Sequence, residues 1–85
     1  MNEAVDWSSI PFARYPIVAR FNLKATKRLW NKQRIYTDGT YYYHKDSLHG
    51  EVEMYDSRGR HFNVLTPEGE DHPQKFRVEG RRIRI

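Results

Sequence analysis

The chain contains no cysteine, which removes two common means of reinforcing a small domain. Without thiols there is neither a disulfide framework nor a thiolate zinc site. There is also no apolar run near the roughly 20 residues that a membrane helix needs. The first stretch, MNEAVDWSSIPFARYP, has an early acidic residue and no long apolar core. We therefore expect no membrane span and no signal peptide.

What is present points to a small folded domain. The 85 residues suit a single domain with one compact core. A chain of this size buries a smaller fraction of its surface than a larger domain does, so its stability should be modest. Aromatic residues make up 14% of the chain, and disordered chains are poor in aromatics. The composition therefore argues against a disordered chain.

Charge is distributed unevenly along the chain, although the net charge is only +4. Residues 1–37 carry seven basic against two acidic side chains, residues 38–73 carry three against eight, and residues 74–85 carry five against one. An acidic middle thus lies between two basic flanks, which can be ordinary solvated surface. It is also what an RNA-cleaving site needs, because cations attract phosphates while carboxylates transfer protons.

The first third of the chain predicts one short helix. Asn22 suits an N-cap, and residues of helical spacing follow it. They are Leu23, Thr26, Leu29 and Trp30. Pro11 and Pro16 break any long element before this point. We therefore expect a helix over residues 22–30.

The remainder predicts antiparallel strands. Asp38-Gly39 lies between two β-prone runs and predicts a hairpin over residues 35–43. A strand from His49 to Tyr55 would pair with residues 60–65, residues 66–73 would form a loop, and residues 76–85 would form a last hairpin.

These elements together predict an α+β fold, a small and highly twisted antiparallel β-sheet with a short N-terminal helix. Residues 1–33 would form an N-terminal arm with the short helix. Residues 34–85 would form the antiparallel-sheet core, and both parts would belong to one domain.

The stretch YHKDSLHGEVEMY, residues 43–55, crowds an aspartate, a histidine and two glutamates into eight residues. In a strand, alternation would put His49, Glu51, Glu53 and Tyr55 on one face, toward solvent or a cleft. The other face, with Val52 and Met54, suits a core. Asp46 lies close enough to His49 to hydrogen-bond its ring and fix its tautomer. Like charges at Glu51 and Glu53 should raise the pKa of at least one carboxyl group, so the stretch carries acid–base equipment.

Other interpretations of these residues stay open. Polar side chains on the wet face of an edge strand are routine without catalysis. His44, Asp46 and His49 could supply metal ligands, but their spacing matches no well-defined zinc pattern, and we expect no metal. Ser47 lacks the elbow that a nucleophilic serine needs. The tyrosines at 41–43 could stack RNA bases, although alternation turns the middle one to the opposite face and predicts that at least one is core.

One motif resembles that of a known toxin family. Tyr43-x-x-Asp46-Ser47-x-His49-Gly50-Glu51-x-Glu53-x-Tyr55 closely resembles the ribonuclease domain of the rRNA-cleaving colicins and cloacin. The likeness continues with Gly59-Arg60-His61, with Thr66-Pro67-Glu68-Gly69 and with the basic ending Arg81-Arg82-Ile83-Arg84. It covers residues 34–85, and nothing in residues 1–33 matches.

Carried over by position, the resemblance implies that Asp46, His49, Glu53 and Arg81 are catalytic. The choice of Arg81 rests on aligning Ile83 with the family's isoleucine, so Arg82 and Arg84 remain alternatives. Lys45 replaces the family's tryptophan, and a stacking contact is lost there or replaced by a phosphate contact. The supporting or RNA-binding residues would be Glu51, Tyr43, Lys45, Tyr55, Arg82 and Arg84.

The activity implied by the resemblance is that of a metal-independent endoribonuclease without a cofactor. It would cut 16S rRNA in the decoding A site of intact bacterial ribosomes by 2′-hydroxyl attack, leave a 2′,3′-cyclic phosphate and stop translation. Glu53 would take the hydroxyl proton, and His49, held by Asp46, would protonate the leaving oxygen; the two roles could be exchanged. Arg81 would bind the phosphorane oxygens.

The resemblance also implies where the protein acts and what restrains it. The toxin would work in the bacterial cytoplasm, and an acidic immunity protein or antitoxin would neutralise it. Residues 1–33 would either bind that antitoxin or support the fold. The competing function is a non-catalytic RNA- or ribosome-binding module, and a third is a protein-interaction domain with no role in RNA binding.

Overall fold

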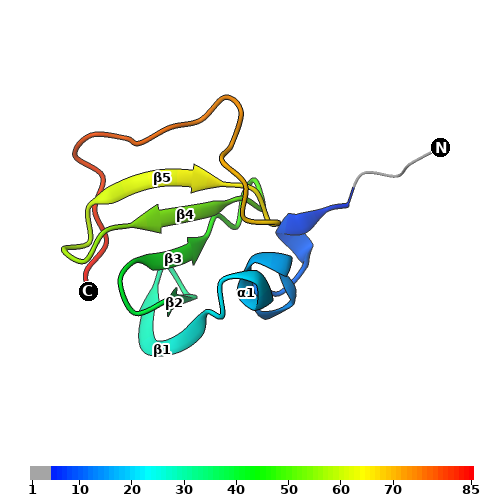
Figure 1. Cartoon of the computed structure of the whole chain (residues 1–85), viewed down its shortest axis with the longest axis horizontal. Helices are drawn as coiled ribbons and strands as arrows, with labels where there is room; N and C mark the ends of the chain where they lie inside the picture. Colours follow the sequence, from blue (N-terminus) through cyan, green and yellow to red (C-terminus); the bar gives the residue numbers. More distant parts are fainter. Residues whose placement is uncertain (1–4) are drawn as a thin grey trace.

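The computed structural model describes residues 5–85 and is built around one antiparallel sheet of five strands in sequential order (Figure 1). The strands are β1 (Lys24–Trp30), β2 (Gln33–Thr37), β3 (Tyr42–Lys45), β4 (Val52–Tyr55) and β5 (His61–Leu65). Three short helical turns precede them: η1 (Trp7–Ser9), η2 (Phe12–Arg14) and α1 (Pro16–Arg20). The expected antiparallel sheet is confirmed.

The helix expected over residues 22–30 is wrong, because Lys24–Trp30 is strand β1. Asn22 has a φ of 54°, a left-handed conformation that asparagine adopts after the end of a helix. It therefore follows α1 instead of starting a new helix. Pairing of β1 with β2 outweighs the weak helical preference of this stretch.

The hairpin predicted at Asp38-Gly39 is confirmed, with Tyr36 opposite Tyr43 across strands β2 and β3. The Asp38 carboxylate accepts the backbone N–H groups of Thr40 and Tyr41, at 2.8 and 2.7 Å, and so closes a loop of four residues. The sequence therefore located this turn correctly from its turn residues.

Buried side chains form two clusters, one on each face of the sheet. The larger comprises Phe12, Tyr15, Ile17, Leu23, Tyr43, Val52 and Leu65, and the smaller comprises Ile35, Tyr55 and Ile83. Residues 12–23 thus share a core with the strands, while residues 1–4 of the predicted N-terminal arm lie outside the described part of the chain.

The C-terminal segment, residues 66–85, is not the hairpin expected over residues 76–85. It arches away from the free edge of β5 and returns to it (Figure 1). Near its start the backbone N–H of His72 donates to the carbonyl of Val64 at 2.9 Å. Near its end the Arg81 carbonyl accepts the backbone N–H of His61, also at 2.9 Å. Only the turn at Glu79-Gly80 remains of the expected element.

Gly59 makes the return of this segment possible. Its φ is +80°, and a Cβ atom there would collide with the backbone of Ile83. The Ile83 N–H donates to the Gly59 carbonyl at 2.9 Å, so the chain end lies directly against the turn between β4 and β5. This contact places Ile83 in the smaller cluster.

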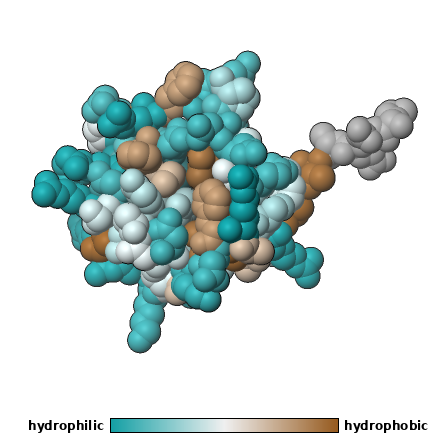
Figure 2. Space-filling view, in the orientation of Figure 1, coloured by the Kyte–Doolittle hydropathy of each residue, from teal (hydrophilic) through white to brown (hydrophobic). Residues whose placement is uncertain are grey.

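The surface on the side drawn in Figure 2 is mostly hydrophilic, with hydrophobic atoms in a few separate areas. Among residues 5–85, no helix is long and apolar enough to cross a bilayer.

Candidate active site

The turn between β3 and β4 carries the first two candidate residues. Strand β4 begins at Val52, so His49 lies in this turn and not in the strand that the sequence predicted. The Asp46 carboxylate accepts the backbone N–H groups of Leu48 (2.9 Å) and His49 (3.2 Å), which is the hydrogen bonding of an Asx-turn. The predicted core face is confirmed, because Val52 lies in the larger cluster and Met54 packs against it.

Asp46 and His49 form the predicted pair. The Nδ1 atom of His49 lies 2.9 Å from the second carboxylate oxygen of Asp46. Burial would raise the pKa of Asp46, but the hydrogen bonds from the side chain and backbone of His49 and the backbone of Leu48 lower it below its usual value. Asp46 is therefore a carboxylate that keeps the proton of His49 on Nδ1 and leaves Nε2 for other partners.

The N-terminal segment braces this turn. The Tyr15 hydroxyl donates to the carbonyl of Gly50 at 2.7 Å. Gly50 has a φ of +76°, and a Cβ atom there would come within 2.6 Å of the Ser8 nitrogen, so only glycine fits. Residues 7–15 therefore fix the position of the turn from outside the stretch that resembles the toxin family.

Lys45 is part of the same brace. Its ammonium group donates to the carbonyls of Ser8 (2.9 Å) and Ile10 (2.7 Å), and the side chain is buried. Both backbone acceptors hold its ammonium group inside the fold, so Lys45 supports the turn in this structure.

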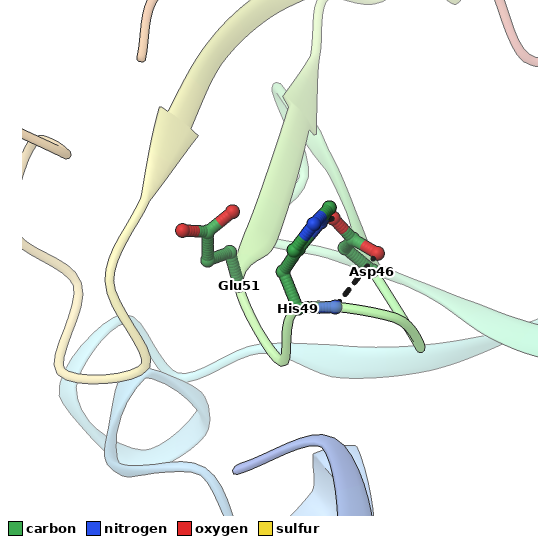
Figure 3. Close-up of side chains that lie close together, drawn as sticks. All are labelled: Asp46, His49 and Glu51. Carbon is green, nitrogen blue, oxygen red and sulfur yellow. Dashed lines mark hydrogen bonds and ion pairs between the residues drawn. The ribbon is translucent and has the colours of Figure 1, made fainter. Parts of the chain in front are cut away.

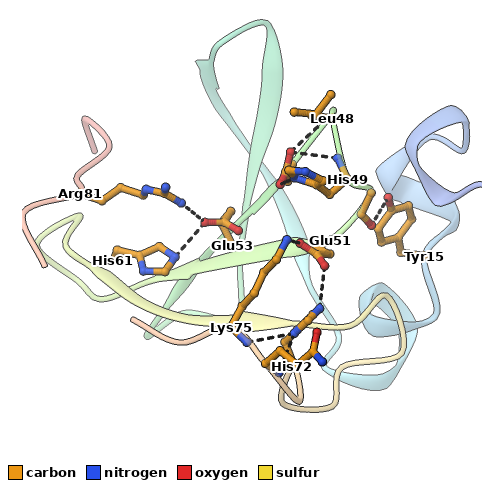
Figure 4. A network of polar contacts seen from close by, with 12 residues as sticks. Tyr15, Leu48, His49, Glu51, Glu53, His61, His72, Lys75 and Arg81 are labelled. Carbon is orange, nitrogen blue, oxygen red and sulfur yellow. Dashed lines mark hydrogen bonds and ion pairs between the residues drawn. The ribbon is translucent and has the colours of Figure 1, made fainter. Parts of the chain in front are cut away.

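Glu53 lies on β4 and is buried, with only 7% of its surface exposed. One carboxylate oxygen accepts hydrogen bonds from His61 (2.8 Å) and from Arg81 (2.6 Å), as Figure 4 shows. Burial would raise the pKa of Glu53, but the hydrogen bonds from His61 and Arg81 and the charge of Arg81 lower it. The increase in carboxyl pKa expected from the charge of Glu51 is therefore not found at Glu53.

His61, on β5, is a site residue that the sequence reasoning did not identify. Its Nδ1 accepts the backbone N–H of Val78 at 2.8 Å and so carries no proton. The proton is therefore on Nε2, which donates to Glu53, and His61 acts as a neutral donor. The available signal was its place in Gly59-Arg60-His61, the turn that forms part of the resemblance.

Arg81 reaches Glu53 because the returning chain end holds it there. The hydrogen bond from the backbone N–H of His61 to the Arg81 carbonyl fixes the register of the chain end against β5. An antiparallel β-bridge between the backbones of Arg60 and Arg82 continues this register. Alternation then turns Arg81 to the same side as buried Ile83 and turns Arg82 away from it. Of the three candidate arginines, Arg81 is the one that binds Glu53.

Glu51 binds the C-terminal segment at a second point. One of its oxygens lies 2.7 Å from the Lys75 ammonium and the other lies 2.7 Å from Nε2 of His72 (Figure 4). The Nδ1 of His72 accepts the backbone N–H groups of Gln74 and Lys75, so Nε2 carries the proton. We name this group of Glu51, His72 and Lys75 the tail clamp. The sequence did not indicate that His72 and Lys75 would bind Glu51.

Two hollows meet at the candidate residues. The first, of about 590 Å³, lies between the turn and the end of the β1–β2 hairpin at Trp30 and Asn31. The second, of about 430 Å³, lies between the turn and residues 75–78. Four residues line both hollows, and we call them the central cluster: Asp46, His49, Glu53 and Arg81. They are the four for which the sequence predicted catalysis.

The other residues predicted to support the site or to bind RNA lie at varying distances from the central cluster. Tyr43 is fully buried and donates its hydroxyl to Asp38, so it is a core residue, as expected of at least one of the three tyrosines. Tyr55 is buried beside the His61 ring and lines the first hollow; burial and the charge of Glu53 raise its pKa to about 12. Arg82 also lines the first hollow, whereas Arg84 lines neither hollow.

A metal site is the remaining chemical possibility. Asp46, His49 and Glu51 each offer a ligand atom, and these atoms lie within 4.8 Å of one another (Figure 3). Hydrogen bonds already occupy the two carboxylates, since Asp46 binds His49 and Glu51 belongs to the tail clamp. His44 is not part of this group, because it is buried and its Nε2 bonds to the Trp30 carbonyl at 2.6 Å.

Comparisons of the chain with protein-family models, with curated protein sequences and with solved structures find no match.

Proposed function

We propose that this protein is a toxin endoribonuclease that cleaves RNA without a metal ion. One observation carries the proposal: the residues at 46, 49, 53 and 81, which the resemblance implies are catalytic, converge where two hollows meet. Arg81 comes from the chain end and Glu53 from a strand 28 residues earlier, yet they lie 2.6 Å apart.

The central cluster can perform the chemistry because RNA brings its own nucleophile. The 2′-oxygen attacks phosphorus and its proton passes to Glu53, a carboxylate whose lowered pKa keeps it ionised. The bond to the 5′-oxygen breaks as that oxygen takes the Nε2 proton of an imidazolium at His49, whose Nδ1 proton stays with Asp46. The products are a 2′,3′-cyclic phosphate and a 5′-hydroxyl. In the reverse assignment His49 accepts the 2′-hydroxyl proton at Nε2, and Glu53 must first be protonated to give a proton to the 5′-oxygen.

Arg81 makes it possible for a phosphate to approach a buried carboxylate. An anionic phosphodiester beside Glu53 alone would be repelled, and the guanidinium compensates that charge. The same group can donate further N–H bonds to the phosphorane oxygens, since it is half exposed.

The proposal extends to the biological setting. The substrate would be 16S rRNA in the decoding site of the bacterial ribosome, attacked in the cytoplasm, and an acidic immunity protein or antitoxin would cover the basic surface. The fold would be the highly twisted sheet with a short N-terminal helix of the toxin family.

The test uses intact bacterial ribosomes and the purified protein in EDTA, with the extracted RNA run on a gel. The wild type should release one discrete fragment of small-subunit RNA. Glu53→Gln should lower the rate by about 10²–10⁴-fold. The exposed Glu68, changed to Gln, is the control for loss of one carboxylate and should cleave normally. Unchanged cleavage by Glu53→Gln would remove Glu53 from the mechanism.

RNA binding without cleavage is favoured by one observation. Glu53 is buried with two donors on one oxygen, which is also how a structural ion pair would attach the chain end to the sheet. A binding module protects RNA in the EDTA experiment, whereas a nuclease fragments it. Intact RNA with folded, inhibitor-free protein would support binding alone.

A further inference from the structure

Phe76 is an apolar side chain in an unexpected place. It lies on the C-terminal segment with 69% of its surface exposed. Its side chain helps to line the second hollow, which also contains His49, Glu53 and Arg81. An exposed aromatic ring beside polar reacting groups forgoes the stabilisation that burial would give. Fold stability therefore does not account for its position.

Two anchors hold the chain on either side of Phe76. The tail clamp fixes Lys75, the preceding residue, to Glu51 at 2.7 Å (Figure 4). Two residues after Phe76, the Val78 N–H donates to His61 at 2.8 Å. With both ends attached to the sheet, the short segment between them keeps the ring beside the hollow. Phe76 is thus a fixed platform and not part of a loose chain end.

The charges around Phe76 suit an anionic polymer. Lys75 precedes it and Arg77 follows it, and both line the second hollow together with Arg81. Proteins that bind single-stranded nucleic acids combine cations for the backbone with aromatic rings on which bases stack. The same combination occurs here within one residue of Phe76.

We infer that Phe76 forms a nucleobase subsite, in which a base next to the scissile phosphodiester stacks on the exposed ring. This inference rests on the proposed ribonuclease function. The base must leave its own stack to reach Phe76, so the enzyme selects unpaired or bulged RNA over duplex. Because every base has a π-face, the subsite selects RNA structure and not sequence.

The first experiment measures binding apart from catalysis. The probe is a single-stranded 2′-O-methyl RNA oligonucleotide that contains 2-aminopurine, which has no free 2′-hydroxyl and cannot be cleaved by this mechanism. Stacking on Phe76 should quench the fluorescence of the wild-type complex. Phe76→Ala should abolish the quenching and weaken affinity by about 5- to 150-fold.

Three further variants distinguish stacking from other causes. Phe76→Trp should retain affinity, because it keeps a π-face. Phe76→Leu should behave like Phe76→Ala, although it keeps an apolar side chain at a site that already tolerates exposure. Leu29→Ala, at an exposed apolar residue of β1 that lines neither hollow, should match the wild type. Wild-type affinity in Phe76→Leu would overturn stacking and indicate a general apolar contact, such as one with a protein partner.

The second experiment separates this inference from the proposed function. Cleavage of single-stranded and duplex RNA is compared for the wild type and Phe76→Ala, and the variant should lose most of the preference for single strands. Equal cleavage and equal preference in both would overturn the subsite while the ribonuclease stands. Phe76-dependent quenching without any cleavage by the wild type would overturn the ribonuclease while the subsite stands.

Discussion

Single side chains at this site are tuned by the groups they touch. Hydrogen bonds from His61 and Arg81, together with the charge of Arg81, outweigh the burial of Glu53 and hold its pKa below the ordinary 4.5. A carboxyl group with a lower pKa in the folded chain stabilises the fold at pH values above its unfolded pKa. That contribution is lost as the pH falls through the folded value. Asp46 contributes to stability with the same dependence on pH, because its pKa is lowered too.

Acid should therefore destabilise the protein through Glu53. We expect the free energy of unfolding to fall as the pH drops below 4.5, the ordinary pKa of a glutamate. Glu53→Gln removes the titrating group and should flatten this pH dependence, whereas Glu68→Gln at an exposed loop position should keep it. Urea unfolding at a series of pH values measures both. Parallel curves for wild type and Glu53→Gln would contradict the assignment.

Asp46 acts through His49, and its removal should change chemistry more than structure. In Asp46→Asn the amide oxygen can still accept the backbone N–H groups of the turn. The amide N–H₂ then faces Nδ1 of His49 and moves the ring proton to Nε2. We expect kcat to fall by about 10²-fold or more, with KM little changed and the pH profile of kcat displaced.

The matched control is Asp56→Asn in the turn between β4 and β5. Asp56 likewise accepts the N–H groups of Arg58 and Arg60, but its side chain contacts no histidine. The control should leave kcat unchanged. Equal losses of kcat in the two variants would show that turn structure, and not the His49 proton, is what Asp46 provides.

At the scale of whole elements, local signals predicted some parts of the fold and not others. The Asp38-Gly39 hairpin follows from turn residues that act within four residues of each other. The stretch at 24–30 was misread, because its strand structure depends on pairing with β2 and not on its own propensity. The C-terminal segment was misread as well, since contacts with distant Glu51 and His61 determine its course.

The tail clamp is the element-level contact that holds Phe76 and Arg81 in place. Glu51→Gln replaces the charged acceptor that faces His72, whose side chain is only 14% exposed, and should lower the free energy of unfolding by about 1–3 kcal/mol. Amide exchange at Val78 should also become faster, because residues 75–78 lose one of their two anchors. The rate of RNA cleavage by Glu51→Gln should fall as well.

Glu70→Gln provides the comparison for the tail clamp. Glu70 pairs with Arg20 at 3.1 Å, but both side chains are at least half exposed. Exposed pairs contribute between zero and about 1 kcal/mol. A cost for Glu51→Gln no larger than that for Glu70→Gln, with unchanged exchange at Val78, would mean that the clamp does not fix the segment.

For the whole molecule, folding redistributes the charge that the sequence lays out in three blocks. Cations of the C-terminal block pair with acids of the middle block, Lys75 with Glu51 and Arg81 with Glu53. The sequence could predict Asp46, His49 and Glu53 because their motif is local and specific, whereas Arg81 came from the resemblance of the chain end. It could not predict that a buried lysine at 45 and a neutral histidine at 61 support the central cluster, since both roles depend on contacts between distant segments.

The basic N-terminal block keeps its charge exposed. Five cations lie on the β1–β2 hairpin: Lys24, Lys27, Arg28, Lys32 and Arg34. Within residues 5–85 none of the five forms an ion pair. A bulge between Ala25 and Leu29 interrupts the pairing and displays Lys27 and Arg28. This hairpin ends at Trp30 and Asn31, on the wall of the first hollow.

RNA binding should consequently depend on salt through this hairpin. Each phosphate neutralised on a single strand contributes about −0.7 to the slope of log affinity against log salt concentration. Changing both Lys27 and Arg28 to Gln should therefore make the slope less steep by about 1–2. Changing Arg14 and Arg58 to Gln removes the same charge from exposed positions outside both hollows and should leave the slope nearly unchanged. Affinities for the uncleavable 2′-O-methyl oligonucleotide, measured over a range of salt concentrations, give each slope. If both double variants reduce the steepness of the slope equally, net charge alone attracts the RNA. The hairpin would then have no special part in guiding the RNA to the central cluster.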